Sequence, residues 1–186
     1  MTIMNDKLNS KLRLDFLDGI RGWAAIMVLL FHLIVNILSN INTAYQTKYL
    51  KFITDGHLAV FIFFVLSGFA LSISFIERPH RITFPYVIIA RYFRLLIPIF
   101  LSSFIAYLLL KENLIFSVQA GELVNSKKWL GAAYDFQASL IHLLKFCFFD
   151  AFFQYESSTS YNKVLWTMSI EYTGSLLIYL SIGIFR

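Results

Sequence analysis

The chain has 186 residues, of which 58% are hydrophobic and only 15% are charged. About a quarter of the residues are charged in a typical soluble domain, and a core of this size could not bury all 20 Phe and 10 Tyr side chains. The composition therefore excludes an ordinary soluble domain and indicates that lipid surrounds much of the protein.

The net charge is +5, and the basic residues lie in short groups between apolar runs. Nucleic-acid-binding proteins instead collect basic residues on one solvated face or arm, so no nucleic-acid partner is expected. Short basic groups are typical of the cytoplasmic flanks of membrane helices. The single cysteine, Cys147, excludes an internal disulfide and a multi-cysteine metal site, and no metal is expected.

Residues 1–17 are polar, contain three basic residues and are predicted to form a cytoplasmic amino-terminal segment. No cleavable signal peptide is expected, because the first apolar run begins late and lacks a small-residue cleavage site behind it. Asp18 is a good helix cap. The first spanning helix is predicted over residues 20–38, where Arg21 is the one Asp, Glu, Lys or Arg residue.

Two further spans are predicted over residues 58–76 and 86–110, which are long and apolar. The hydrophilic segment between them contains a helix breaker, Pro79, and the positive-inside rule places it in the cytoplasm. Residues 111–138 are polar and are predicted to lie outside.

The run from Leu140 to Tyr155 is apolar but is interrupted by His142, Lys145 and Asp150. It predicts an interfacial or re-entrant helix rather than a full span. A fourth span is predicted over residues 164–185. The sequence thus predicts an all-α fold, a polytopic transmembrane helix bundle in which residues 1–186 form one membrane domain. It would have about four spanning helices and one shorter helix, in the inner or plasma membrane with a cytoplasmic amino terminus.

Ionisable residues inside a span are costly, so each is a candidate functional position. Arg21 and His32 are eleven residues apart, which places both on one face of an α-helix, about 16 Å apart along its axis. Histidine titrates near neutral pH and suits general base catalysis. The alternatives are a structural hydrogen bond of His32 to a neighbouring helix and an interfacial anchoring role for Arg21.

Glu171 lies one turn inside the predicted last span, on the outer side. It could orient a histidine or hold an acceptor hydroxyl, or it could make a structural hydrogen bond between helices. Arg91 and Arg94 are three residues apart and share a helix face at the predicted cytoplasmic boundary. Two guanidinium groups suit a phosphate-rich ligand; lipid headgroup binding is the alternative.

The remaining polar candidates are assigned structural roles. Asp18 is predicted to be a helix cap and a partner of Arg21 rather than a catalytic acid. His57 and His142 lie near loops or interfaces. No histidine lies within four residues of Cys147, so a thiol nucleophile is not expected.

Four segments resemble the acyltransferase-3 family, which includes polysaccharide O-acetylases. Residues 17–32 resemble its first membrane helix, whose hallmark is an arginine or lysine, ten residues and then a histidine, here Arg21 and His32. Residues 63–69 resemble its second helix. Residues 91–94 match its Arg-x-x-Arg motif, and residues 165–171 resemble its Trp-Ser-Leu-Ser-x-Glu segment, with Thr167 in place of a serine and Tyr172 after it where a second acid is common.

The resemblance implies a catalytic His32 supported by Arg21, an acyl-coenzyme A site that includes Arg91 and Arg94, and Glu171 near the reaction centre. Family members are roughly twice as long, so the chain resembles only the amino-terminal part and the bundle is expected to be incomplete. The implied function is transfer of an acyl group, with acetyl expected, from acyl-coenzyme A to a hydroxyl of a cell-surface glycan. The alternatives are a proton-coupled transporter or channel fragment and an inactive, truncated remnant.

Overall fold

The computed structural model describes residues 2–45, 50–77 and 84–184, and every regular element in these ranges is a helix, as predicted. Five elements in these ranges are π-helical or 3₁₀-helical and are named η. In chain order the elements are α1 (Thr2–Leu30), η1 (Phe31–Leu38), α2 (Ser39–Ile41), η2 (Thr43–Tyr45), α3 (Gly56–Glu77), α4 (Phe84–Lys111), α5 (Ser117–Leu123), η3 (Lys127–Gly131), α6 (Leu140–Lys145), η4 (Phe146–Asp150), α7 (Ala151–Phe153), η5 (Lys163–Leu165) and α8 (Trp166–Ile184).

In the described part of the chain, three helical stretches are long and apolar enough to cross a membrane: Asp15–Ile41, Gly56–Ile73 and Pro85–Lys111. They coincide with the first three predicted spans. The helix α8 has 19 residues but is not among them, because Glu171 and several hydroxyl residues lower the hydropathy of its first half. The fourth span therefore stays a prediction.

The first helix begins much earlier than predicted. α1 starts at Thr2 and continues through Asp18, so the prediction of a cap at Asp18 is wrong. Neither glycine nor proline occurs between Thr2 and Leu17, and nothing in the local sequence therefore stops the helix. The predicted pairing of Asp18 with Arg21 is confirmed, at 2.9 Å between Oδ1 and Nη1.

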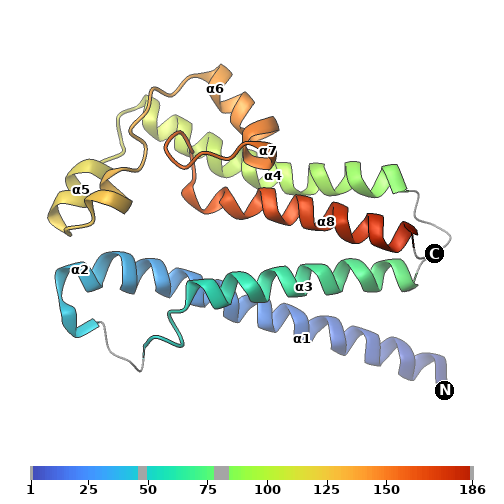
Figure 1. Cartoon of the computed structure of the whole chain (residues 1–186). Coiled ribbons are helices and arrows are strands. Elements are labelled where there is room, and N and C mark those ends of the chain that lie inside the picture. The colour runs from blue at the N-terminus through green and yellow to red at the C-terminus, as the bar shows by residue number, and fades with distance from the viewer. Residues whose placement is uncertain (1, 46–49, 78–83, 185–186) are drawn as a thin grey trace. The chain divides into compact units, whose positions relative to one another are not determined.

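The chain forms two compact units, Met1–Phe69 and Ala70–Arg186. In the first unit, α1 and η1 run antiparallel to α3 (Figure 1), around a small core of Ala24, Met27 and Ala59. Small side chains let the two helices approach closely. Gly56, the first residue of α3, lies close to the ring of Phe31. A Cβ on Gly56 would lie only 2.7 Å from Cγ of Phe31, so glycine is required at this position.

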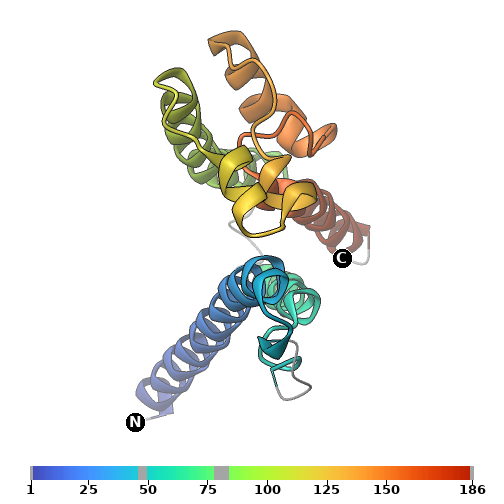
Figure 2. The same ribbon diagram turned by 90° about the vertical axis from the view of Figure 1, so that its left-hand side faces the viewer.

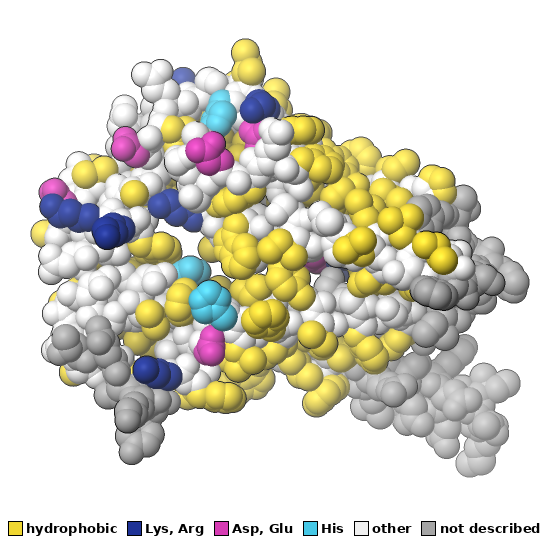
Figure 3. All heavy atoms as spheres, viewed as in Figure 1, with side chains coloured by type: hydrophobic (Ala, Val, Ile, Leu, Met, Phe, Trp, Pro, Cys, Tyr) yellow, Lys and Arg dark blue, Asp and Glu magenta, His cyan; other side chains and the backbone are white. Residues whose placement is uncertain are grey.

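In the second unit, α4 packs against α8 and against the segment formed by α6, η4 and α7. The core between them is rich in aromatic side chains, and Phe146, Phe152 and Tyr161 are among its most deeply buried members. Hydrophobic side chains also cover the outer faces of α4 and α8, whereas charged side chains gather over the end that carries α5 and α6 (Figure 3). An apolar outer face on these helices is what a lipid environment requires.

The segment from α6 to α7 lies along α4 rather than across its end. Its start contacts Tyr161, whose ring packs against Tyr107 near the end of α4. Its other end meets Tyr92, whose hydroxyl donates to the carbonyl of Phe148 at 2.7 Å. Tyr92 and Tyr107 are about 22 Å apart along a helix. If α4 spans the membrane, this geometry favours the re-entrant alternative over the interfacial one.

The predicted external segment, residues 111–138, contains two short helices that the sequence analysis missed. α5 and η3 fold back on each other (Figure 2), and a Cβ on Gly121 would lie 2.5 Å from Cα of Gly131. The two backbones are therefore in direct contact at a pair of glycines. Such short helices depend on this packing, since helices of one or two turns are not stable alone.

Candidate functional site

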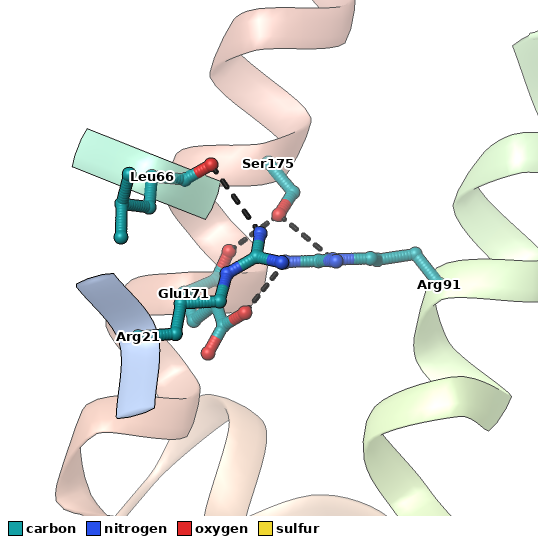
Figure 4. A network of polar contacts seen from close by, with 5 residues as sticks. All are labelled: Arg21, Leu66, Arg91, Glu171 and Ser175. Atoms are coloured by element: carbon teal, nitrogen blue, oxygen red, sulfur yellow. Dashed lines mark hydrogen bonds and ion pairs between the residues drawn. The ribbon is translucent and has the colours of Figure 1, made fainter. Parts of the chain in front are cut away.

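In the first unit, Arg21 connects α1 with α3. One guanidinium nitrogen donates to Asp18 at 2.9 Å. The other lies 3.5 Å from the backbone carbonyl oxygen of Leu66 (Figure 4). The Arg21 side chain is 37% exposed. Its charge is thus paired within its own helix and directed at the polar backbone of the neighbouring helix of the same unit.

His32 lies in η1, a π-helical stretch that the sequence analysis treated as ordinary α-helix. The imidazole is half-buried, and its Nδ1 lies 2.9 Å from the side-chain amide nitrogen of Asn36. Its ring also packs edge-on against Phe31. π-helical turns often occur at functional sites. The sequence of residues 31–38 did not predict a π-helical turn.

The prediction that Arg21 and His32 share one helix face assumed α-helical geometry throughout, and the structure departs from that geometry only in the last two residues. The α-helical geometry on which it depends holds from Arg21 to Leu30, and the wider π-helical turn begins at Phe31. Because nine of the eleven steps are α-helical, the shared face remains the geometric expectation for this pair.

In the second unit, Arg91 of α4 makes a buried ion pair with Glu171 of α8 (Figure 4). The distance from Nη2 to Oε1 is 2.6 Å, and Nε donates to the hydroxyl of Ser175 at 3.1 Å. Ser175 in turn donates to the backbone carbonyl of Glu171 at 2.6 Å. The side chains of Arg91 and Glu171 are 9% and 24% exposed, so the pair is largely removed from solvent.

This ion pair changes the predicted depths of its two members. Arg91 follows the first residue of α4 by seven positions, or about 10 Å, and the sequence analysis placed it near the inner boundary. Glu171 was placed on the outer side, yet its carboxylate touches the Arg91 guanidinium. Both depths cannot be right. The physical reason is that the second turn of α8, which carries Glu171, lies beside the third turn of α4, which carries Arg91.

The two arginines of the Arg-x-x-Arg motif have different surroundings. Arg91 is buried and bonded to α8, whereas Arg94 is exposed. The spacing predicted a shared helix face but could not predict that one guanidinium would have a carboxylate partner 80 residues later. Of the two, Arg94 is the side chain that is exposed on the surface of the unit.

The remaining candidates have structural surroundings. Nδ1 of His142 lies 3.0 Å from the hydroxyl of Tyr161, and the His142 ring packs against Phe136. Burial raises the pKa of Tyr161 to about 12. Cys147 is fully buried, which is typical of an unreactive core thiol.

Comparison with known proteins identifies one family. The family model for acyltransferase-3 proteins, described as an acyltransferase domain, matches residues 14–186. Neither a curated protein nor a solved structure matches the chain significantly. The family match includes all five candidate residues: Arg21, His32, Arg91, Arg94 and Glu171.

Proposed function

Because the chain belongs to the acyltransferase-3 family, we propose that it transfers an acyl group from acyl-coenzyme A to a hydroxyl of a cell-surface glycan. Acetyl is the proposed acyl group. The observation that carries this proposal is His32 itself: an imidazole in a π-helical stretch of an apolar helix, bonded through Nδ1 to Asn36. A histidine held in this way has a defined orientation and can exchange a proton at its other nitrogen.

In the proposed reaction, Nε2 of His32 removes the proton of the acceptor hydroxyl. The hydroxyl oxygen attacks the thioester carbonyl, the carbon–sulfur bond breaks, and the coenzyme A thiolate leaves and takes up a proton. Attack by Nε2 itself, to form an acyl-histidine that then passes its acyl group to the hydroxyl, is the second route, and both end in the same ester and thiol. Both need Nε2 unprotonated at the start.

Asn36 is proposed to set this protonation state. A neutral imidazole carries its proton on one nitrogen, and the bond made by the other nitrogen selects which one. The side-chain amide of Asn36 can present oxygen or nitrogen to Nδ1, because its two ends have the same shape. The nitrogen faces Nδ1 in the structure, and the proposed reaction uses the flipped amide: with the oxygen facing Nδ1, the proton resides there and Nε2 is the base.

The donor is proposed to bind near Arg94 and Arg91. Coenzyme A carries phosphate groups, which guanidinium groups bond in a bidentate manner. Arg94 is exposed and can meet a phosphate directly. Arg91 would reach one only by exchanging the Glu171 carboxylate for phosphate oxygens, so we propose that Glu171 holds Arg91 in place and that Arg94 makes the first contact.

The test is transfer of label from radiolabelled acetyl-coenzyme A to glycan in membranes that contain the protein. We expect His32→Ala to lower transfer by about 10²- to 10⁴-fold, the usual contribution of a general base. The control is Leu33→Ala, which changes an exposed side chain in the same π-helical stretch and should keep transfer. Full transfer by His32→Ala would remove the catalytic assignment. Transport of protons without any coenzyme A dependence would favour the transporter alternative.

A further inference from the structure

A cavity of about 440 Å³ lies in the first unit, at the end where η1 and α2 lead to the turn before α3. Phe31, Val35 and Ser39 form one wall, and Tyr45 and the segment from Leu50 to Gly56 form the rest. The volume falls within the range of about 300–1,000 Å³ that small-molecule sites occupy.

The lining combines two aromatic rings with charged and hydroxyl groups. Phe31 and Tyr45 supply the rings, and Lys51, Thr54 and Asp55 supply the polar atoms. Oδ1 of Asp55 accepts from the backbone N–H of Leu58 at 3.0 Å, and the hydroxyl of Thr54 donates to the carbonyl of Leu50 at 2.7 Å. Both polar side chains are therefore held in fixed positions on the cavity wall.

The aromatic, charged and hydroxyl groups on the cavity wall together indicate which class of ligand fits the cavity. An acyl chain would bury Lys51 and Asp55 against hydrocarbon, which is costly. A phosphate would meet the Asp55 carboxylate, which already occupies the positive end of α3. A sugar ring instead offers C–H faces to aromatic rings and hydroxyls to charged side chains, and each group on the cavity wall has a complement in it.

We propose that this cavity binds one hexose ring of the acceptor glycan, a subsite that rests on the proposed function for its place in the reaction. Phe31 connects the cavity with the proposed base: it lines the cavity, and its ring centroid lies 5.2 Å from that of His32. The same ring lies so close to Gly56 that a Cβ there would be 2.7 Å from its Cγ. The cavity wall and the proposed base are therefore neighbours in one helical stretch, η1.

The first experiment measures sugar binding without any acyl donor. The full chain in detergent micelles is mixed with methyl β-glucoside, methyl β-galactoside or N-acetylglucosamine, and saturation transfer from protein to sugar is recorded by NMR. At least one sugar should show transfer. Asp55→Asn should weaken its binding about tenfold, the effect of one hydrogen bond to a charged group, and Phe31→Ala should weaken it as well.

Two features make the variants informative. Asparagine is as good a helix cap as aspartate, so Asp55→Asn keeps the start of α3 while removing the charge. Leu33→Ala is the control, since Leu33 is exposed and is not part of the cavity, and it should bind as the parent does. Absence of transfer to all three sugars, or equal binding by Asp55→Asn and the parent, would overturn the subsite.

The second experiment separates the subsite from the reaction. In the labelled transfer assay, Asp55→Asn should raise the KM for the acceptor about tenfold and leave kcat and the KM for acetyl-coenzyme A unchanged. An unchanged acceptor KM would contradict the subsite while leaving the acyltransferase proposal intact. Sugar binding that is lost in Asp55→Asn, in a protein that transfers no label, would support the subsite and contradict the proposed reaction instead.

Discussion

The two units of the chain are stabilised to different degrees by their own packing. In the first unit, 11% of an 18-residue window of Asp15–Ile41 is buried, and the described core consists of three side chains. The share is 17% for Gly56–Ile73, whose last four residues belong to the second unit. In the second unit, 28% of an 18-residue window of Pro85–Lys111 is buried, and twelve buried side chains share one core. The unit that carries His32 therefore depends more on its surroundings, whereas the unit that carries Glu171 is fixed from within.

This comparison is tested most strongly by truncating one core side chain in each unit. Phe152 is 1% exposed and packs against Tyr92 and Tyr172, so Phe152→Ala should lower the free energy of unfolding by about 4 kcal/mol. Met27 is 8% exposed and has two alanines as its core partners, so Met27→Ala should cost less than half as much. The measurement is thermal unfolding in detergent. Equal losses would show that the two units are equally well packed.

A somewhat smaller effect is expected from the buried ion pair of the second unit. Glu171→Ala leaves the Arg91 guanidinium buried without its carboxylate, which should cost about 3 kcal/mol. The double variant Arg91→Met, Glu171→Met removes both charges and should recover most of that stability, because two apolar side chains of similar size replace the pair. Recovery is read from the same thermal unfolding. A double variant as unstable as the single one would mean that the hydrogen bonds to Ser175, rather than the charges, hold α4 to α8.

The elements that could be predicted from the sequence are those that depend on local composition. The first three spans follow from long apolar stretches, and the pairing of Asp18 with Arg21 follows from their spacing on one helix. The early start of α1, the π-helical turn at His32 and the short helix α5 leave no such signal. The short helix α5 depends on a backbone contact, that between Gly121 and Gly131, which forms only in the folded chain.

The candidate site shows the same division. Motif and spacing identified Arg21, His32, Arg91, Arg94 and Glu171 as the residues of interest. They did not reveal that Arg91 and Glu171 bond to each other, because nothing in a periodic pattern connects residues 80 positions apart. The pairing also depends on how α8 is positioned along α4, which only the folded chain shows. The sequence thus predicted which residues are candidates for the site, but not which of them bond to each other.

The smallest expected effect concerns pH and again distinguishes the units. Tyr161 belongs to the core of the second unit, is fully buried and donates to the carbonyl of Ser139 at 3.3 Å. Its pKa is about 12 in the folded protein, against about 10 in an unfolded chain. The folded state therefore keeps a proton that the unfolded state loses, so stability falls as the pH rises from about 10 to about 12.

Replacing Tyr161 with phenylalanine separates this titration from that of other groups. At pH 8, Tyr161→Phe should be about 1 kcal/mol less stable than the parent, because it lacks the hydrogen bonds to Ser139 and His142. Towards pH 11, the parent loses the stability that depends on the phenolic proton and the variant does not, so the gap should narrow. Thermal unfolding of both proteins at the two pH values measures it. A gap that stays constant with pH would show that water reaches the phenol, and that the aromatic core of the second unit is less closed than its packing indicates.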